Sequence, residues 1–272
     1  MEGLKVRVLY LGRAEHGKFE LVQANDKTEQ ILSPRMTVLI DHPTLGYILY
    51  DTGDSDNWET DYPQSLLERY PLKEHLLLKD KLAECGVPIE KIDQVILSHL
   101  HFDHAGGLRN FVGKKAAKNV IVSEEEAKEV FFQTIANKDE LRPAYISNVF
   151  HNLEGVTFRT VTGITELAPD FTLFVQHSHT AGVVGMILRF QDGAQMIFCC
   201  DTVYTKEAFE KELPPGGGIN KTDDEFYRQL DILKQMQKDT GAYMVFGHDY
   251  QQTKALEDLG WIQGKEQLSL LR

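Results

Sequence analysis

Three histidines and an aspartate lie within six consecutive positions of this chain, in the segment SHLHFDHAGG. An apolar run precedes the segment and two glycines end it, which is typical of a buried strand leading into a loop. In extended backbone, side chains two residues apart point the same way, so His99 and His101 can share one cation. Asp103 and His104 follow a bend and can bind a second cation nearby. Because imidazoles crowded together without a metal would repel one another on protonation, the cluster predicts a metal site.

Three further residues of metal-binding type each follow an apolar, strand-like run. His179 comes after the run at 171–175, Asp201 after MIFCC, and His248 after YMVFG. Strand ends are places where irregular backbone can direct several side chains at one point. Two adjacent cations repel each other, so a two-metal site needs a bridging carboxylate and a bridging hydroxide. The repeated pattern of strand followed by ligand therefore offers the additional groups that such a site requires.

Charge and composition exclude several classes of function. The 272 residues carry 41 acidic and 29 basic side chains, and this formal charge of -12 disfavours binding to nucleic acid. The three cysteines have no C-x-x-C spacing, and we expect them to be buried apolar side chains. No apolar run approaches the roughly 18 residues of a membrane span, and charges interrupt the N-terminal stretch where a signal peptide would be apolar. We therefore expect a cytoplasmic protein that binds no membrane.

The apolar patterns predict a layered α/β protein. Strand-like runs lie at 4–11, 36–41, 46–51, 93–97, 118–122, 156–161, 171–176, 183–190, 195–200 and 242–247. Helical periodicity lies at 63–85, 123–135, 204–212 and 223–239, and Ser123 before three glutamates is typical of a helix N-terminus. Several predicted strands come before the first strand that alternates with a helix, and more strands follow it. This order favours mixed sheets over a doubly wound parallel sheet. No linker separates these elements, so we expect residues 1–272 to form one domain.

The pattern H-x-H-x-D-H followed by Gly-Gly resembles the signature of the metallo-β-lactamase-fold hydrolases. The segments LYDTG, DTVYTKEAFEKELP and FGHD are also similar, in order and spacing, to the N-acyl-homoserine lactonases and related small lactonases. This resemblance covers about residues 36–255. It implies an αβ/βα four-layer sandwich with two mixed sheets and a two-metal site along one edge.

The resemblance also implies roles for individual residues. It places His99, His101 and His179 on one zinc ion, and Asp103, His104 and His248 on the other, with Asp201 bridging. Tyr204 matches a tyrosine beside the substrate carbonyl, and Asp51 matches a buried aspartate that supports the site, unless it only forms the Asp-Thr-Gly turn.

The segment QHSHTAGVVG departs from the family pattern, because Val183 stands after Gly182 where the family usually has histidine. The spacing to Gly182 favours His179 over His177 as the ligand. The nitrogen-rich ligand set favours zinc, although other divalent metals can substitute. His16, His42, His75 and His151 have no partner spacing, and we expect them at the surface or in packing.

We interpret the chain as a dizinc hydrolase that opens a small lactone ring, such as that of an N-acyl-homoserine lactone in quorum quenching. A metal-bridging hydroxide would attack the carbonyl, Tyr204 would polarise it, and Asp103 would transfer a proton to the leaving alkoxide. A pyridoxolactone-like lactonase shares all these motifs, and a glyoxalase II-like thioesterase or a phosphodiesterase shares the histidine cluster. A binding module with a non-catalytic metal site is the alternative from another class. The sequence does not determine the acyl chain length or the oligomeric state.

Overall fold

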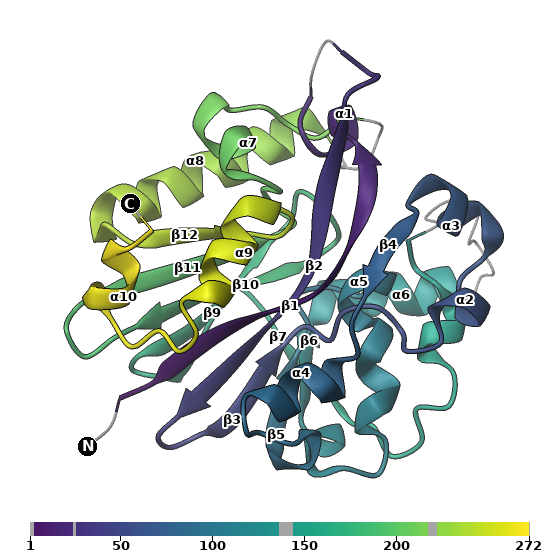
Figure 1. The fold of residues 1–272 in the computed structure, drawn as a ribbon, viewed down its shortest axis with the longest axis horizontal. Coiled ribbons are helices and arrows are strands. Elements are labelled where there is room, and N and C mark those ends of the chain that lie inside the picture. Colours follow the sequence, from purple (N-terminus) through teal and green to yellow (C-terminus); the bar gives the residue numbers. More distant parts are fainter. Residues whose placement is uncertain (1–2, 24–25, 136–143, 217–221, 272) are drawn as a thin grey trace.

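Two mixed β-sheets pack face to face at the centre of the fold, and helices cover the outer side of each sheet (Figure 1). The computed structural model describes residues 3–23, 26–135, 144–216 and 222–271. The first sheet has the strand order β4 (Leu72–His75), β1 (Lys5–Gly17), β2 (Gln30–His42), β3 (Gly46–Tyr50), β5 (Ile92–Ile96), β6 (Val120–Ser123) and β7 (Phe158–Val161). The second has the order β12 (Tyr243–Phe246), β11 (Gln195–Cys200), β10 (Val183–Arg189), β9 (Phe171–Gln176) and β8 (Ile164–Ala168).

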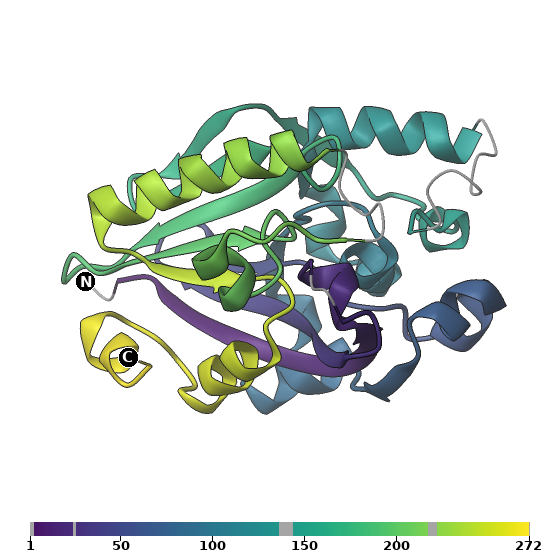
Figure 2. The ribbon, with the colours of Figure 1, turned by 90° about the horizontal axis from the view of Figure 1, so that it is seen from above.

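The helices lie mainly outside the two sheets. In chain order they are α1 (Lys18–Leu21), α2 (Trp58–Asp61), α3 (Gln64–Arg69), α4 (Leu78–Glu84), α5 (Phe102–Ala105), α6 (Glu124–Ile135), α7 (Lys206–Lys211), α8 (Asp223–Thr240), α9 (Tyr250–Asp258) and α10 (Lys265–Ser269). Figure 2 shows α8 lying along the second sheet, where Leu230 and Leu233 pack near Ile197 of β11. Buried residues of α4, α5 and α6 pack in the same way with the first sheet.

The alternation of side chains along each strand explains this layering. Ile48 and Tyr50 of β3 pack between the two sheets, whereas Leu49 packs against the helices outside the first sheet. In β11, Phe198 points into the central core and Ile197 points toward α8. Successive residues of a strand face opposite sides, so a strand buried on both faces needs an unbroken apolar run. The predicted αβ/βα sandwich with mixed sheets is therefore confirmed.

Local capping signals set several helix boundaries. Ser123 accepts a hydrogen bond from the backbone N–H of Glu126 at 3.0 Å, as its position before three glutamates predicted. The side chain of Thr222 caps α8 through the N–H of Glu225 at 3.1 Å, and Gly241 ends this helix with a φ of 65°. Glycine adopts that left-handed conformation without a steric penalty, so the predicted helix at 223–239 ends there.

The prediction of continuous helical periodicity over 63–85 was wrong. The structure has α3, then strand β4, then α4 in this region. Pro71 has no N–H to donate and disfavours helical backbone at the residue before it, so the helix ends at Arg69. Residues 72–75 instead pair with β1, with Gly12 opposite His75. The pattern also gave no signal for β8, and it predicted β1 and β2 shorter than they are because their outer halves are polar.

None of the helices in the described part of the chain combines the length and the apolar composition that a membrane span requires.

Candidate metal centre

Strand ends from both sheets meet where the predicted ligands lie. In the second sheet, β9, β11 and β12 run parallel to one another, so their carboxyl ends lie at the same edge. His179, Asp201 and His248 follow these three ends. The loop after β5 of the first sheet joins this edge, because the N–H of Val184 donates to the carbonyl of Ser98 at 2.7 Å. The topology thus brings together segments that are distant in the sequence.

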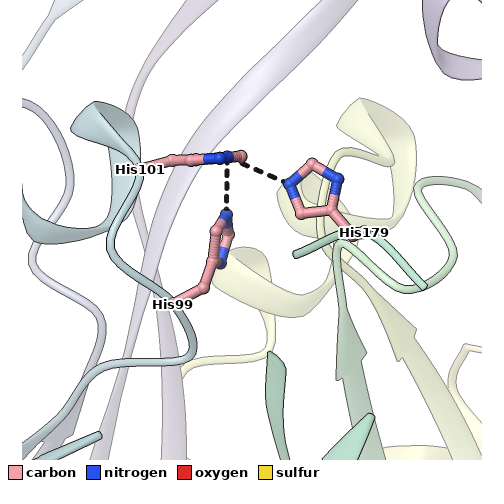
Figure 3. A group of neighbouring side chains, drawn as sticks. All are labelled: His99, His101 and His179. Carbon is pink, nitrogen blue, oxygen red and sulfur yellow. Dashed lines mark hydrogen bonds between the residues drawn. The ribbon is translucent and has the colours of Figure 1, made fainter. Parts of the chain in front are cut away.

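The first group of predicted ligands is a cluster of three imidazoles (Figure 3). Nδ1 of His101 lies 3.1 Å from Nε2 of His99 and 3.0 Å from Nε2 of His179. Burial is the main cause that lowers the pKa of all three, to about 4 for His179. A neutral imidazole has the lone pair that a metal needs. These three nitrogen atoms therefore form one side of a cation site.

The second group combines a carboxylate and two imidazoles. Oδ2 of Asp103 lies 3.9 Å from Nε2 of His104 and 3.8 Å from Nε2 of His248. Burial alone would raise the pKa of Asp103, but Arg35, His104 and His248 outweigh it and lower this pKa below its usual range. Asp103 is therefore an anion next to two nitrogen atoms, as a divalent cation requires.

Asp201 lies between the two groups. Its Oδ2 is 3.5 Å from Nε2 of His179 on one side. On the other side the same oxygen is 3.1 Å from Nε2 of His248 and 3.5 Å from Nε2 of His104. One carboxylate oxygen thus reaches both groups, which is the position that a bridging ligand needs between two cations.

Several histidines of the cluster have a partner on the ring nitrogen that faces away from its centre. Nδ1 of His104 lies 2.8 Å from Oδ2 of Asp51, and Nδ1 of His248 lies 2.7 Å from Oγ of Ser33. Nδ1 of His179 lies 3.0 Å from the Tyr204 hydroxyl. Such contacts orient the ring and place the lone pair of Nε2 toward the metal side. They fix the three rings without using the nitrogen atoms that face the cluster.

These residues fit a pair of cations. Nε2 of His104 is buried and has no hydrogen-bond partner within the described ranges. Burial would lower the pKa of His104. Its neighbours outweigh burial and raise this pKa well above the usual value: Asp201, Cys200, Asp103 and Asp51. The surroundings that stabilise a positive imidazole also stabilise a bound divalent cation. Imidazole nitrogen with carboxylate oxygen is a ligand set typical of zinc.

Cys200 lies near His99 and His104, but it faces the supporting side of His104. Its Sγ is 3.8 Å from Nδ1, the nitrogen that contacts Asp51. Burial and Asp201 raise the pKa of this thiol to about 12, so it stays protonated and is a poor metal ligand. The expectation that Cys199 and Cys200 are buried side chains is confirmed, whereas Cys85 is only partly buried.

The structure brings together all seven sequence-predicted ligands and places Tyr204 and Asp51 beside them. His177 is exposed, and its Nδ1 lies 2.8 Å from the carbonyl oxygen of Ala181. The geometry therefore agrees with the choice of His179 over His177. Asp51 accepts hydrogen bonds from the N–H and the hydroxyl of Ser98, each at 2.7 Å, so it does more than form a turn.

Backbone strain at two strand ends helps to aim these side chains. Asp51 follows β3 with a φ of 64°, and Cys200 ends β11 with a φ of 47°. Residues other than glycine seldom adopt positive φ, and such strained positions concentrate at functional sites. Here the strain lies at Asp51, which supports His104, and next to the central Asp201.

Sequence reasoning missed a buried ion triad next to Asp103. Arg35 of β2 is 2% exposed, and its Nε lies 2.9 Å from Oδ2 of Asp54 while its Nη1 lies 3.0 Å from Oδ2 of Asp103. Burial would lower the pKa of Arg35, but Asp103 and Asp54 raise it, so the guanidinium stays charged. Cζ of the Arg35 guanidinium also lies 5.6 Å from the centre of the Phe102 ring. An arginine after Ser-Pro gives no local signal that it will be buried.

Glu126 of α6 is a second residue whose role the sequence did not reveal. It is fully buried, and its Oε1 accepts hydrogen bonds from the N–H of Leu100 at 3.0 Å and from the Tyr145 hydroxyl at 2.9 Å. The Tyr145 ring lies 4.7 Å from the His101 ring, centre to centre. Glu126 therefore holds the loop that carries His99 and His101. Its position in a run of three glutamates indicated only a helix N-terminus.

Comparison with known proteins agrees with this geometry. Residues 32–248 match the metallo-beta-lactamase superfamily, and the chain belongs to this superfamily. An N-acyl homoserine lactonase of Bacillus thuringiensis is 27% identical over 175 residues, which are 64% of this chain and 62% of that protein. The match thus spans less than two thirds of that relative. N-acyl homoserine lactonase AiiB of Agrobacterium fabrum is 25% identical over 239 residues, 80% of this chain and 83% of its own length.

Solved structures show the same fold. A mutant of B. thuringiensis AiiA with N-decanoyl-L-homoserine at its active site superposes with a TM-score of 0.77 and 22% identity, covering 94% of this chain and 97% of that one. AidC, described as a dizinc quorum-quenching lactonase, has a TM-score of 0.69 and 16% identity, covering 92% of this chain and 89% of that one.

We predict that Arg35→Met lowers the free energy of unfolding by about 3–5 kcal/mol, because it leaves the buried Asp54 carboxylate without its positively charged partner. Burial already raises the pKa of Asp54, and Arg35 is the main group that opposes this shift. Urea denaturation of the metal-free protein measures the change. The double variant Arg35→Met/Asp54→Leu is the control, and it should regain part of the loss. Equal stability of the single and double variants would contradict the assignment.

Proposed function

We propose that this protein is a metal-dependent hydrolase that opens small lactone rings, with N-acyl-homoserine lactones as the substrate class. The observation that carries the proposal is the position of Asp201 between two groups of metal-binding atoms, with the buried Tyr204 hydroxyl beside one of them. The names of the relatives support the substrate class, since both are lactonases of N-acyl homoserine lactones.

We assign two zinc ions to the seven ligands. His99, His101 and His179 would hold one ion, and Asp103, His104 and His248 the other, with Asp201 shared. Bound there, the ions supply Lewis-acid chemistry and lower the pKa of water toward neutrality. This set matches the expectation from the sequence residue by residue.

Tyr204 is the proposed donor to the substrate carbonyl. Burial, followed by the charge of Asp201, raises the pKa of its phenol well above the usual value, so the hydroxyl keeps its proton. Because Nε2 of His179 faces the cluster, Nδ1 of His179 carries the hydrogen and donates it to the phenol oxygen of Tyr204. The phenol proton is then free to donate to the carbonyl oxygen as negative charge develops there.

Asp103 is the proposed proton carrier. Its carboxylate is anionic and partly exposed, and it lies beside both His104 and His248. It accepts the proton that the attacking water loses and delivers it to the oxygen of the leaving alkoxide. The product is the ring-opened hydroxy acid, and the ester C–O bond of the ring is the bond that breaks.

A panel of substrates tests the proposal. N-acyl-homoserine lactones of several chain lengths, a pyridoxolactone-type lactone, a thioester and a phosphodiester are each offered to the zinc-loaded protein, and acid release is followed with a pH indicator. Opening of the acylated lactones supports the proposal. Preference for the other lactone or the thioester would reassign the substrate class, and no turnover of any compound would favour a binding module.

The metal assignment predicts close to two zinc equivalents per chain in the purified protein, because each ligand group can hold one ion. Elemental analysis measures the content. Removing the metal should also lower the melting temperature, since the clustered carboxylates and imidazoles lose the charge that stabilises them. A folded, active sample with one equivalent or none would overturn the dizinc assignment.

Tyr204→Phe tests the proposed donor, because it deletes only the hydroxyl. We expect kcat for the lactone to fall on the order of 10²-fold at saturating zinc, as is typical when one such donor is lost. The zinc content at saturation should stay at two. Since the hydroxyl also contacts His179, zinc affinity is measured separately with a competing chelator. Normal kcat in the zinc-saturated variant would assign Tyr204 to structure alone.

We also infer that residues 1–272 form one domain, because Val6 of β1 pairs with Ile262 near the other end of the described chain. A cytoplasmic location remains a prediction from the sequence, as does the absence of nucleic acid and membrane partners.

A further inference from the structure

His16 of β1 is a buried histidine with unsatisfied ring nitrogens. Its residue exposure is 7%, and neither Nδ1 nor Nε2 has a hydrogen-bond partner among the residues that the structure describes. The nearest carboxylate oxygen, Oε2 of Glu20, lies 4.0 Å from Nδ1, beyond hydrogen-bond distance. The other oxygen of Glu20 accepts from Arg69 at 3.0 Å. Buried polar atoms are normally paired, so an unpaired imidazole calls for a partner outside the chain.

The surroundings of His16 place it beside the metal centre. Its ring stacks on Tyr70 with 4.7 Å between ring centres and an angle of 28°. On another side, the His248 ring lies 6.3 Å away. Tyr70 in turn stacks on Phe102, which is next to Asp103 in the chain. His16 is therefore next to one of the proposed ligands, His248.

This side of the centre is also the side that solvent reaches. Asp103 and Tyr70 are partly exposed, whereas His104, His179 and His248 are buried. The His16 ring, stacked on Tyr70, lies on this partly exposed side. A neutral imidazole has one nitrogen that donates and one that accepts a hydrogen bond.

We propose that His16 is a specificity-determining residue that hydrogen-bonds the acylamino substituent of the substrate, outside the reacting ring. This inference rests on the proposed function. An amide offers an N–H donor and a carbonyl acceptor, and either one can pair with a neutral imidazole. A carboxylate or phosphate substituent is a poorer match, because a neutral imidazole supplies no compensating charge. Substrates without the amide would leave the buried ring unpaired, which disfavours them.

The test compares two lactones that share a five-membered ring, N-hexanoyl-homoserine lactone and γ-butyrolactone, which lacks the acylamino group. His16→Phe keeps a flat ring and removes both nitrogen atoms. We expect the ratio of kcat/KM for the acylated lactone to that for γ-butyrolactone to fall about 10-fold, mainly through KM of the acylated lactone. This ratio does not depend on the fraction of folded enzyme, so partial unfolding of the variant cannot produce the change.

Two further variants sharpen the test. His16→Gln retains a donor and an acceptor, and it should recover part of the ratio. His75→Phe is the matched control. His75 of β4 also has two buried ring nitrogens without a partner in the described structure, but its ring lies edge-on to Trp58 of α2, 6.4 Å away between ring centres. It should leave the ratio unchanged. Zinc content, measured on each variant, should remain at the wild-type value.

The outcomes separate this inference from the proposed function. If the wild-type protein opens neither lactone, the proposed function fails and the role of His16 fails with it. If the wild-type protein opens the acylated lactone but His16→Phe leaves the ratio unchanged, only the role of His16 is overturned. A fall in the His75→Phe control equal to that in His16→Phe would likewise overturn it.

Discussion

The charge balance around Asp201 is the constraint on which the rest of the site depends. Asp51, Asp103 and Asp201 lie within a small region whose histidines are nearly all buried, and burying carboxylates without compensating positive charge is costly. Arg35 supplies one fixed positive charge next to Asp103. The raised pKa of His104 reflects the negative charge that remains. The two cations that we propose at the ligand groups would complete the balance between the closely spaced carboxylates and imidazoles.

Both sheets supply residues to this charged site. The first sheet supplies the loop after β5, and the second supplies three parallel strand ends that carry His179, Asp201 and His248. The hydrogen bond from Val184 to Ser98 fixes one edge against the other. The positive φ angles of Asp51 and Cys200 cost conformational energy, and the stability of the surrounding sheets offsets this cost. Neither sheet alone contains both ligand groups.

The residues around the ligands divide the centre into two sides. Asp51, Ser98 and Cys200 contact Nδ1 of His104, which is buried. Asp103 and Tyr70 lie on the partly exposed side, with His16 behind Tyr70. Tyr204 contacts His179 and lies 5.2 Å from the His248 ring, between ring centres. The proposed donor thus comes from a buried part of the fold, while we propose that the substituents of a substrate meet His16 of β1 beside Tyr70.

The sequence by itself determined the ligand types, their local spacing and the strand that precedes each one, because these depend on neighbouring residues and on periodicity. It therefore predicted the seven clustered residues, the mixed sheets and the ends of α6 and α8. Only the tertiary structure decided the partners of Arg35 and Glu126, the burial of His16, and the division of 63–85 into helix, strand and helix. The physical reason is that an ion pair between β2 and the loop after β5, or the pairing of β4 with β1, depends on segments that meet only after the chain has folded.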